Sequence, residues 1–79
     1  MEHIIYQVSK DTSSIISRIR WSTDQELYIE FRTNNKIYCY SKVPKETVIA
    51  LVSSESIGKY FNKNIKKNFK YEIIEEAKV

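Results

Sequence analysis

Residues 15–40 read IISRIRWSTDQELYIEFRTNNKIYCY, and this stretch decides the fold. Apolar and polar side chains alternate along three parts of it, residues 15–21, 27–31 and 37–40. Alternation with a period of two, rich in β-branched and aromatic residues, is typical of β-strands that bury one face. The stretch therefore predicts three consecutive antiparallel strands, each with an apolar and a polar face.

The first connection predicts how the first two strands pair. A three-residue loop at 23–25 would set Trp21 opposite Leu27 and keep the apolar side chains on one face of the sheet. Arg18 would then lie opposite Glu30 on the other face, where the two side chains can form an ion pair. A shift of one residue would bury the arginines at a high free-energy cost, so the pattern selects this register.

The second connection is predicted to be a two-residue turn at Asn34-Asn35, because asparagine tolerates the positive φ of such turns. This turn would set Phe31 opposite Tyr38. The face expected to be buried then carries Ile15, Ile19, Trp21, Leu27, Ile29, Phe31, Tyr38 and Tyr40. The opposite face carries Ile16, Arg18 and Arg20 from the first of these strands.

The second half of the chain changes to a helical period. Pro44 suits the first position of a helix, where its missing N–H has no intrahelical partner, and Ser56 is a candidate cap for a second helix. Residues 4–9 are a candidate for a further edge strand. We expect one α+β domain over residues 1–79: an antiparallel β-meander of three to four strands, followed by two C-terminal helices packed on one sheet face.

Positive charge is concentrated in residues 57–71, which contain five lysines and no acidic residue. The chain has a net charge of +3, so the remaining residues carry 3 − 5 = −2, with an acidic tail at Glu72, Glu75 and Glu76. On one continuous helix the lysines would occupy an arc about 100° wide beside the aromatic side. The candidate phosphate-binding residues are Lys59, Lys63, Lys66, Lys67 and Lys70. The alternative is a solvated helix face.

The composition gives little support to catalysis or metal binding. The chain has one cysteine, Cys39, which the strand pattern predicts to be a small buried or half-buried apolar residue, and one histidine, His3, near the N-terminus. Neither has partners at the spacing of a transition-metal site or a catalytic base. We expect no enzyme activity and no cofactor. Residues 1–10 lack the apolar run of a signal peptide, and we expect a cytoplasmic protein.

These features together resemble the KTSC family, a short domain found at the C-terminus of some lysyl-tRNA synthetases and as a stand-alone bacterial or phage protein. The resemblance covers residues 13 to about 71. It rests on Ser13-Ser14-Ile15, Leu27-x-Ile29-x-Phe31, Tyr38-Cys39-Tyr40, Val43-Pro44 and the stretch Ser56-Ile57-Gly58-Lys59-Tyr60-Phe61-Asn62. The chain departs from the family where Asn34-Asn35 replaces a glycine turn and Trp21 replaces a tyrosine. The synthetase association implies a role in RNA binding.

Three functions remain open at this point. The first is a module that binds RNA, another nucleic acid or a nucleotide through the lysines. Its candidate base-stacking residues are Tyr60, Tyr38, Tyr40 and Tyr28. The second is a protein-interaction module, such as a phage or bacterial inhibitor or adaptor, or a small oligomer, that docks through a sheet edge or face. The third is a sponge for a nucleotide second messenger. Tyr38 and Tyr40 are also expected on the buried face, which competes with a role in stacking.

Overall fold

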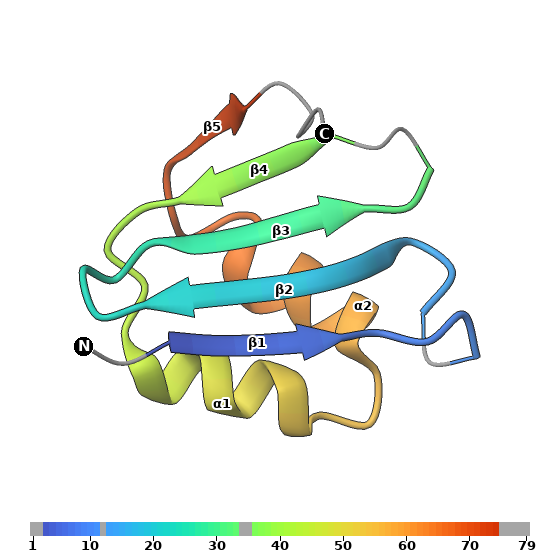
Figure 1. The fold of residues 1–79 in the computed structure, drawn as a ribbon. Helices are drawn as coiled ribbons and strands as arrows, with labels where there is room; N and C mark the ends of the chain where they lie inside the picture. Colours follow the sequence, from blue (N-terminus) through green and yellow to red (C-terminus); the bar gives the residue numbers. More distant parts are fainter. Residues whose placement is uncertain (1–2, 12, 34–35, 75–79) are drawn as a thin grey trace.

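In a computed structural model, the strands form one antiparallel sheet with the helices on one of its faces (Figure 1). The structure describes residues 3–11, 13–33 and 36–74. The strands lie in chain order: β1 His3–Gln7, β2 Ile16–Ser22, β3 Leu27–Phe31, β4 Ile37–Tyr40 and β5 Tyr71–Ile74. Between β4 and β5 come the helices α1 Lys45–Ser53 and α2 Ile57–Tyr60 and the π-helix η1 Phe61–Ile65. The predicted α+β meander and edge strand β1 are confirmed, and a fifth strand follows the helices where the acidic tail was expected to begin.

The pairing of β2 with β3 confirms the first predicted register. Trp21 lies opposite Leu27, and Arg18 lies opposite Glu30. The Arg18 Nε is 3.8 Å from the Glu30 Oε1, so the expected ion pair forms on the polar face. Gln25, the last residue of the three-residue loop, has a φ of 66°. A left-handed residue at this position is usual in three-residue hairpin loops.

The pairing of β3 with β4 differs from the prediction by two residues. Tyr38 lies opposite Ile29 rather than opposite Phe31. The Phe31 N–H donates to the Lys36 carbonyl at 3.0 Å and closes a connection longer than two residues. The predicted Asn34-Asn35 turn lies outside the described residues. Because side chains alternate with a period of two, a shift of two leaves every side chain on its predicted face.

The start of β2 contradicts the prediction for its two isoleucines. Ile16 is fully buried, whereas Ile15 is 44% exposed. The register shifts between Ile16 and Arg18, which marks a β-bulge. A bulge adds one residue to one strand and reverses the side on which the preceding residues point. Ile16 thus joins the core, and Ile15 lies at the rim of the helix-bearing side.

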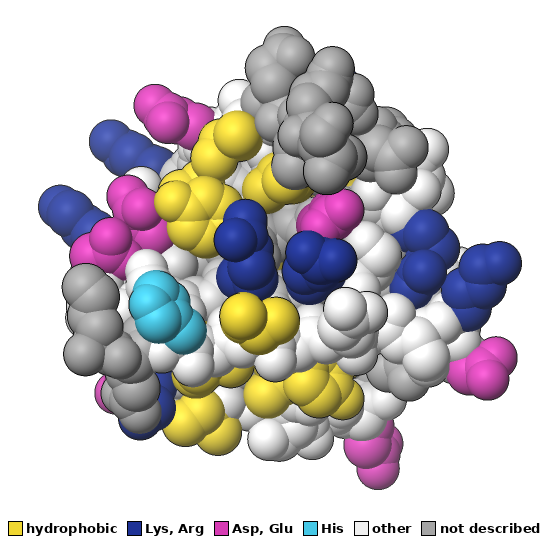
Figure 2. Space-filling model, in the orientation of Figure 1, with side chains coloured by type: hydrophobic (Ala, Val, Ile, Leu, Met, Phe, Trp, Pro, Cys, Tyr) yellow, Lys and Arg dark blue, Asp and Glu magenta, His cyan; other side chains and the backbone are white. Residues whose placement is uncertain are grey.

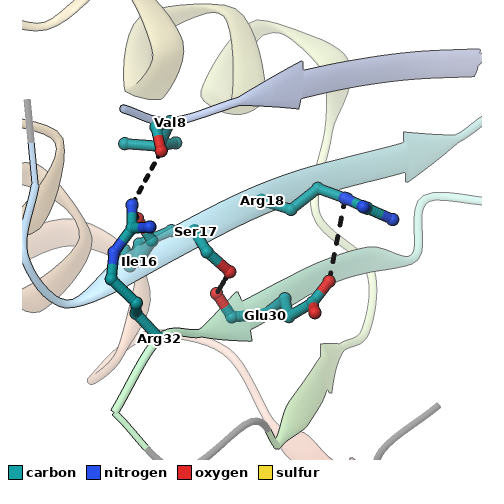
Figure 3. Close-up of polar contacts among 6 residues, drawn as sticks. All are labelled: Val8, Ile16, Ser17, Arg18, Glu30 and Arg32. Carbon is teal, nitrogen blue, oxygen red and sulfur yellow. Dashed lines mark hydrogen bonds and ion pairs between the residues drawn. The ribbon is translucent and has the colours of Figure 1, made fainter. Parts of the chain in front are cut away.

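Arg32 ties the bulged start of β2 to the end of β1 (Figure 3). One terminal nitrogen of its guanidinium lies 2.7 Å from the Val8 carbonyl, 3.1 Å from the Ile16 carbonyl and 3.3 Å from the Ser13 carbonyl. The Arg32 Nε is buried and has no hydrogen-bond partner among the described residues. A half-buried charge thus satisfies backbone groups that the irregular segment leaves without sheet partners.

The hydrophobic core fills the space between the sheet and the helices. Trp21 is 4% exposed, as predicted, and its Nε1–H donates to the Val43 carbonyl at 2.8 Å. The core is a single cluster: Val8, Ile16, Ile19, Trp21, Leu27, Ile29, Tyr40, Val43, Val48, Leu51, Ile57, Phe61 and Ile65. Within the described part of the chain, no helix is long and apolar enough to cross a membrane.

The expected second helix begins as predicted but ends early. The Ser56 hydroxyl accepts from the Lys59 N–H at 3.4 Å and caps α2. The helix then widens into η1, where the Lys66 N–H donates to the Phe61 carbonyl at 2.8 Å. The Asn68 side-chain amide donates to a backbone carbonyl at 2.8 Å, and such local bonds compete with continued helix. Lys66, Lys67 and Lys70 therefore follow the helix rather than continuing it.

Candidate functional site

A cleft of about 310 Å³ opens between the sheet and the α2–η1 segment. It lies at the end of the sheet where β2 begins and β3 ends. Its walls combine aromatic rings with a few polar side chains: Ile15, Ile16, Phe31, Thr33, Tyr38, Tyr40, Gly58, Phe61, Asn62 and Lys66. A concave, largely apolar site with a small number of polar groups is typical of ligand pockets.

The aromatic rings of the cleft pack in a fixed arrangement. Phe31 meets Tyr38 edge-on, with ring centroids 4.9 Å apart, and Phe61 meets Tyr40 edge-on at 5.5 Å. Tyr40 is 2% exposed, and burial raises the pKa of its hydroxyl to about 12. Tyr38 is half-buried. Tyr40 is therefore a core residue that supports the site, whereas Tyr38 offers part of its ring to the cleft.

Tyr71 on β5 extends this aromatic cluster along the same face of the sheet, beyond the helices. Its ring lies 5.2 Å from the Tyr38 ring and 5.4 Å from the Tyr40 ring. Tyr71 and its same-face neighbour Ile73 are each 50% exposed. The helices thus leave the β5 part of this face uncovered, whereas they cover Tyr40 on β4.

Four of the five predicted lysines share one surface. Lys59, Lys63, Lys66 and Lys67 line a shallow depression of about 560 Å³ together with Asn62, and we call these four residues the lysine surface. Asn62 and Lys66 also line the cleft, so the lysine surface and the cleft are continuous.

Lys70 lies apart from the other lysines. It lines a separate hollow of about 350 Å³ with Ser41, Lys42, Asn68 and Phe69. The predicted single arc of five lysines is therefore wrong, because the helix ends before Lys70. Lys42, which the sequence analysis did not single out, joins Lys70 there.

Tyr28 lies on the opposite face of the sheet, as expected. The Arg20 guanidinium lies over its ring, with the central carbon 5.1 Å from the ring centroid. The Tyr28 hydroxyl donates to the Glu26 carboxylate at 3.0 Å, which raises the pKa of Tyr28 to about 12. Arg20 and Tyr28 line a hollow of about 320 Å³ together with His3. Figure 2 shows basic, acidic and apolar side chains mixed over this face, so its described residues form no continuous basic path.

Other residues complete the account of the candidates. Tyr60 is half-buried against the core, and it lines neither the cleft nor the lysine surface. Sequence reasoning missed Thr33 and Asn62 at the cleft and Tyr71 beside it. The alternation of Tyr71 and Ile73 was a signal for β5, although a short one. Among residues 3–11, 13–33 and 36–74, no group of three His, Cys, Asp or Glu side chains is placed to hold a metal ion.

Comparison with known proteins gives consistent matches. The model of the family described as the KTSC domain matches residues 12–69. A lysine–tRNA ligase from Trichormus variabilis is 40% identical over 70 residues, which cover 87% of this chain and 12% of the ligase. A crystal structure of a KTSC domain protein from Yersinia pestis matches with a TM-score of 0.80 and 30% identity, covering 92% of this chain and 99% of that one. The chain thus spans a small part of the ligase and nearly all of the Yersinia protein.

Proposed function

Because this chain belongs to the KTSC domain family, and because its cleft is continuous with a basic surface, we propose that it is a non-enzymatic module that binds single-stranded RNA. In this proposal the cleft receives a base and the lysine surface holds the adjoining phosphates. The observation that carries the proposal is the pair of residues, Asn62 and Lys66, that line both.

The shape and chemistry of the cleft support a base as its occupant. A nucleobase is flat, with an apolar face and a polar edge, and proteins commonly stack it on aromatic side chains. Tyr38 and Phe31 supply exposed ring surface. The Thr33 hydroxyl and the Asn62 amide are placed on the same lining and can donate or accept hydrogen bonds at the base edge.

The lysine surface supports phosphates as the neighbouring groups. The stretch that carries it has no acidic residue from Ile57 to Tyr71, so nothing in the local sequence offsets its charge. Each lysine that neutralises a phosphate releases condensed counterions, which makes binding depend on salt. The name of the Trichormus relative, a lysine–tRNA ligase, also connects this family with proteins that act on RNA.

The state of the cysteine supports a binding role without catalysis. Cys39 is 7% exposed, and desolvation raises the pKa of its thiol. A buried thiol with a raised pKa stays protonated at neutral pH and is a poor nucleophile.

A protein-interaction module is the second candidate, and the exposed edge strand β5 favours it. Ile73 and Tyr71 are half-exposed on it, and β5 is an edge strand of the sheet that the described residues form. Exposed sheet edges can bind a partner as an added strand.

The test compares RNA affinity at two salt concentrations. We would titrate the protein into a fluorescein-labelled, single-stranded 10-mer RNA and follow fluorescence anisotropy in about 50 and 200 mM salt. With four lysine–phosphate contacts, a plot of the logarithm of the affinity against the logarithm of the salt concentration has a slope of about −2.8. The affinity then falls about fiftyfold over this range of salt. The double variant K63E/K67E should lose most of the affinity and flatten the slope.

The matched control is K10E/K45E, which changes the net charge by the same −4 at residues that line neither the cleft nor the lysine surface. Its affinity should fall far less than that of K63E/K67E. Equal losses in the two variants would mean that only overall charge matters. Undetectable binding by the parent protein at low salt would reject RNA and favour the protein-interaction candidate.

A further inference from the structure

The cleft has room for little more than one nucleotide, yet aromatic side chains continue past it along β4 towards a second, separate pair of lysines. The cleft lies where β2 begins, β3 ends and β4 begins. Tyr71 pairs with Tyr40, the last residue of β4, which also lines the cleft, so Tyr71 lies beside the cleft on the next strand. The Tyr38 ring stands between the two places, 4.9 Å from Phe31 on the cleft side and 5.2 Å from Tyr71 on the other.

A second basic pair lies next to Tyr71. The Ser41 N–H donates to the Lys70 carbonyl at 3.0 Å and extends the β4–β5 pairing by one step. Lys42, two residues after the end of β4, has a φ of 60° and makes a left-handed turn there. The hollow that Lys42 and Lys70 line is thus adjacent to the first residue of β5. Lys70 directly precedes Tyr71 in the chain, and Lys42 lines the same hollow as Lys70.

From this arrangement we infer that β5 carries a second nucleotide subsite, in which Tyr71 stacks a base and Lys42 and Lys70 hold its phosphate. The inference rests on the proposed function and deepens it, because it makes the ligand a strand of at least two nucleotides rather than a free nucleotide. The RNA strand runs along β4, from the lysine surface and the cleft at one end to the Lys42–Lys70 pair at the other.

The spacing of the rings also favours an RNA strand whose neighbouring bases are not stacked on each other. Successive bases in a stacked strand rise by about 3.4 Å. The Tyr38 and Tyr71 centroids are 5.2 Å apart, and a base on each side of this pair is farther still from its neighbour. A duplex cannot separate its bases in this way, whereas single-stranded loops and ends can.

The test measures two ligands with the parent protein and four variants. A hexauridylate RNA is followed by fluorescence anisotropy, and uridine monophosphate by chemical-shift changes in a ¹⁵N-labelled sample. In Tyr71→Leu, which keeps an apolar side chain but removes the ring, hexauridylate affinity should fall about tenfold, since base–aromatic stacking supplies roughly that factor or more. Uridine monophosphate affinity should stay within twofold, because the cleft is unchanged. The charge reversal K42E/K70E should likewise lower the affinity for hexauridylate and leave that for uridine monophosphate unchanged.

Two further variants serve as controls. Tyr71→Phe keeps the ring and should bind both ligands like the parent. Tyr6→Leu removes a similarly exposed tyrosine from the other edge strand and should also leave both affinities unchanged. An equal loss for both ligands in Tyr71→Leu would mean that Tyr71 only supports Tyr38, and the second subsite would be rejected.

The outcomes separate this inference from the proposed function. If K63E/K67E loses RNA binding while Tyr71→Leu and K42E/K70E do not, RNA binding stands and the second subsite is wrong. If the parent binds neither ligand, both are wrong.

Discussion

Arg32 gives the sharpest test of how the cleft wall is held, because the chain offers a matched arginine beside it. Arg32 directly follows β3 and Arg18 lies on the neighbouring strand β2, and Figure 3 shows both. Arg32 contacts three backbone carbonyls: those of Val8 after β1, of Ser13, and of the cleft residue Ile16 at the start of β2. Arg18 makes one ion pair with Glu30, and their side chains are 45% and 33% exposed. We would replace each arginine by methionine, which keeps the aliphatic stem.

The structure sets the size of the Arg32→Met effect. One nitrogen carries two hydrogens, so only two of the three carbonyls can receive a well-formed bond, and 3.3 Å to Ser13 is the weakest contact. Two charge-assisted bonds are worth about 3 kcal/mol or more. Removing the buried, unpartnered Nε returns roughly 1 kcal/mol of desolvation cost. The free energy of unfolding should therefore fall by about 2 kcal/mol, a large share for a domain of this size. Arg18→Met should cost at most about 0.5 kcal/mol.

Urea unfolding, followed by the fluorescence of Trp21, measures both variants in one assay. With a slope of about 1 kcal/mol per molar urea, the midpoint of Arg32→Met should fall by about 2 M, and that of Arg18→Met by less than about 0.5 M. Similar shifts in the two variants, or a shift for Arg32→Met no larger than that expected for Arg18→Met, would refute the reasoning. They would mean that water replaces the guanidinium at these carbonyls without cost.

Two further predictions concern buried groups. Trp21→Phe leaves the Val43 carbonyl without its donor and should lower the free energy of unfolding by about 2 kcal/mol, measured by circular dichroism during urea unfolding. Tyr28 and Tyr40 should ionise near pH 12 in absorbance titrations at 295 nm, and Glu26→Gln should lower the pKa of Tyr28 towards its usual 10. Because both pKa values are raised in the folded state, their contribution to stability is complete below pH 10 and is lost between about pH 10 and 12. An unfolding free energy that stays constant across that range would contradict the assignment.

The β-sheet could be predicted from the sequence only as far as its two faces. Alternation assigns a side chain to a face, because one face must be buried, and it did so correctly for β3 and β4. It cannot detect a shift of two residues, which leaves both faces unchanged, and the β3–β4 register was wrong by that amount. Alternation also cannot predict which of Ile15 and Ile16 is buried, since either of two adjacent isoleucines can point to the core. The β-bulge between Ile16 and Arg18 sets which one does.

The candidate site was less predictable, because it depends on packing between distant segments. The lysines could be grouped from their spacing only by assuming one regular helix, and η1 ends that helix before Lys70. The rings of Phe31 and Phe61 meet at the cleft only because η1 packs on β3 and β4. Tyr71 belongs to a four-residue strand beside acidic residues, where too few positions alternate to indicate a strand.

The two proposed subsites differ in their relation to the family. All residues of the cleft and of the lysine surface lie inside the stretch, 12–69, that matches the KTSC model. Lys70 and Tyr71 lie beyond it. A base-binding cleft built by the sheet and η1 would thus be a property that relatives can share through the fold itself. The second subsite needs only two side chains after the matched stretch and Lys42, so it can be gained or lost without disturbing the core. Members that keep the cleft but lack an aromatic residue at the position of Tyr71 should bind a mononucleotide as well as this protein does and a longer strand less tightly.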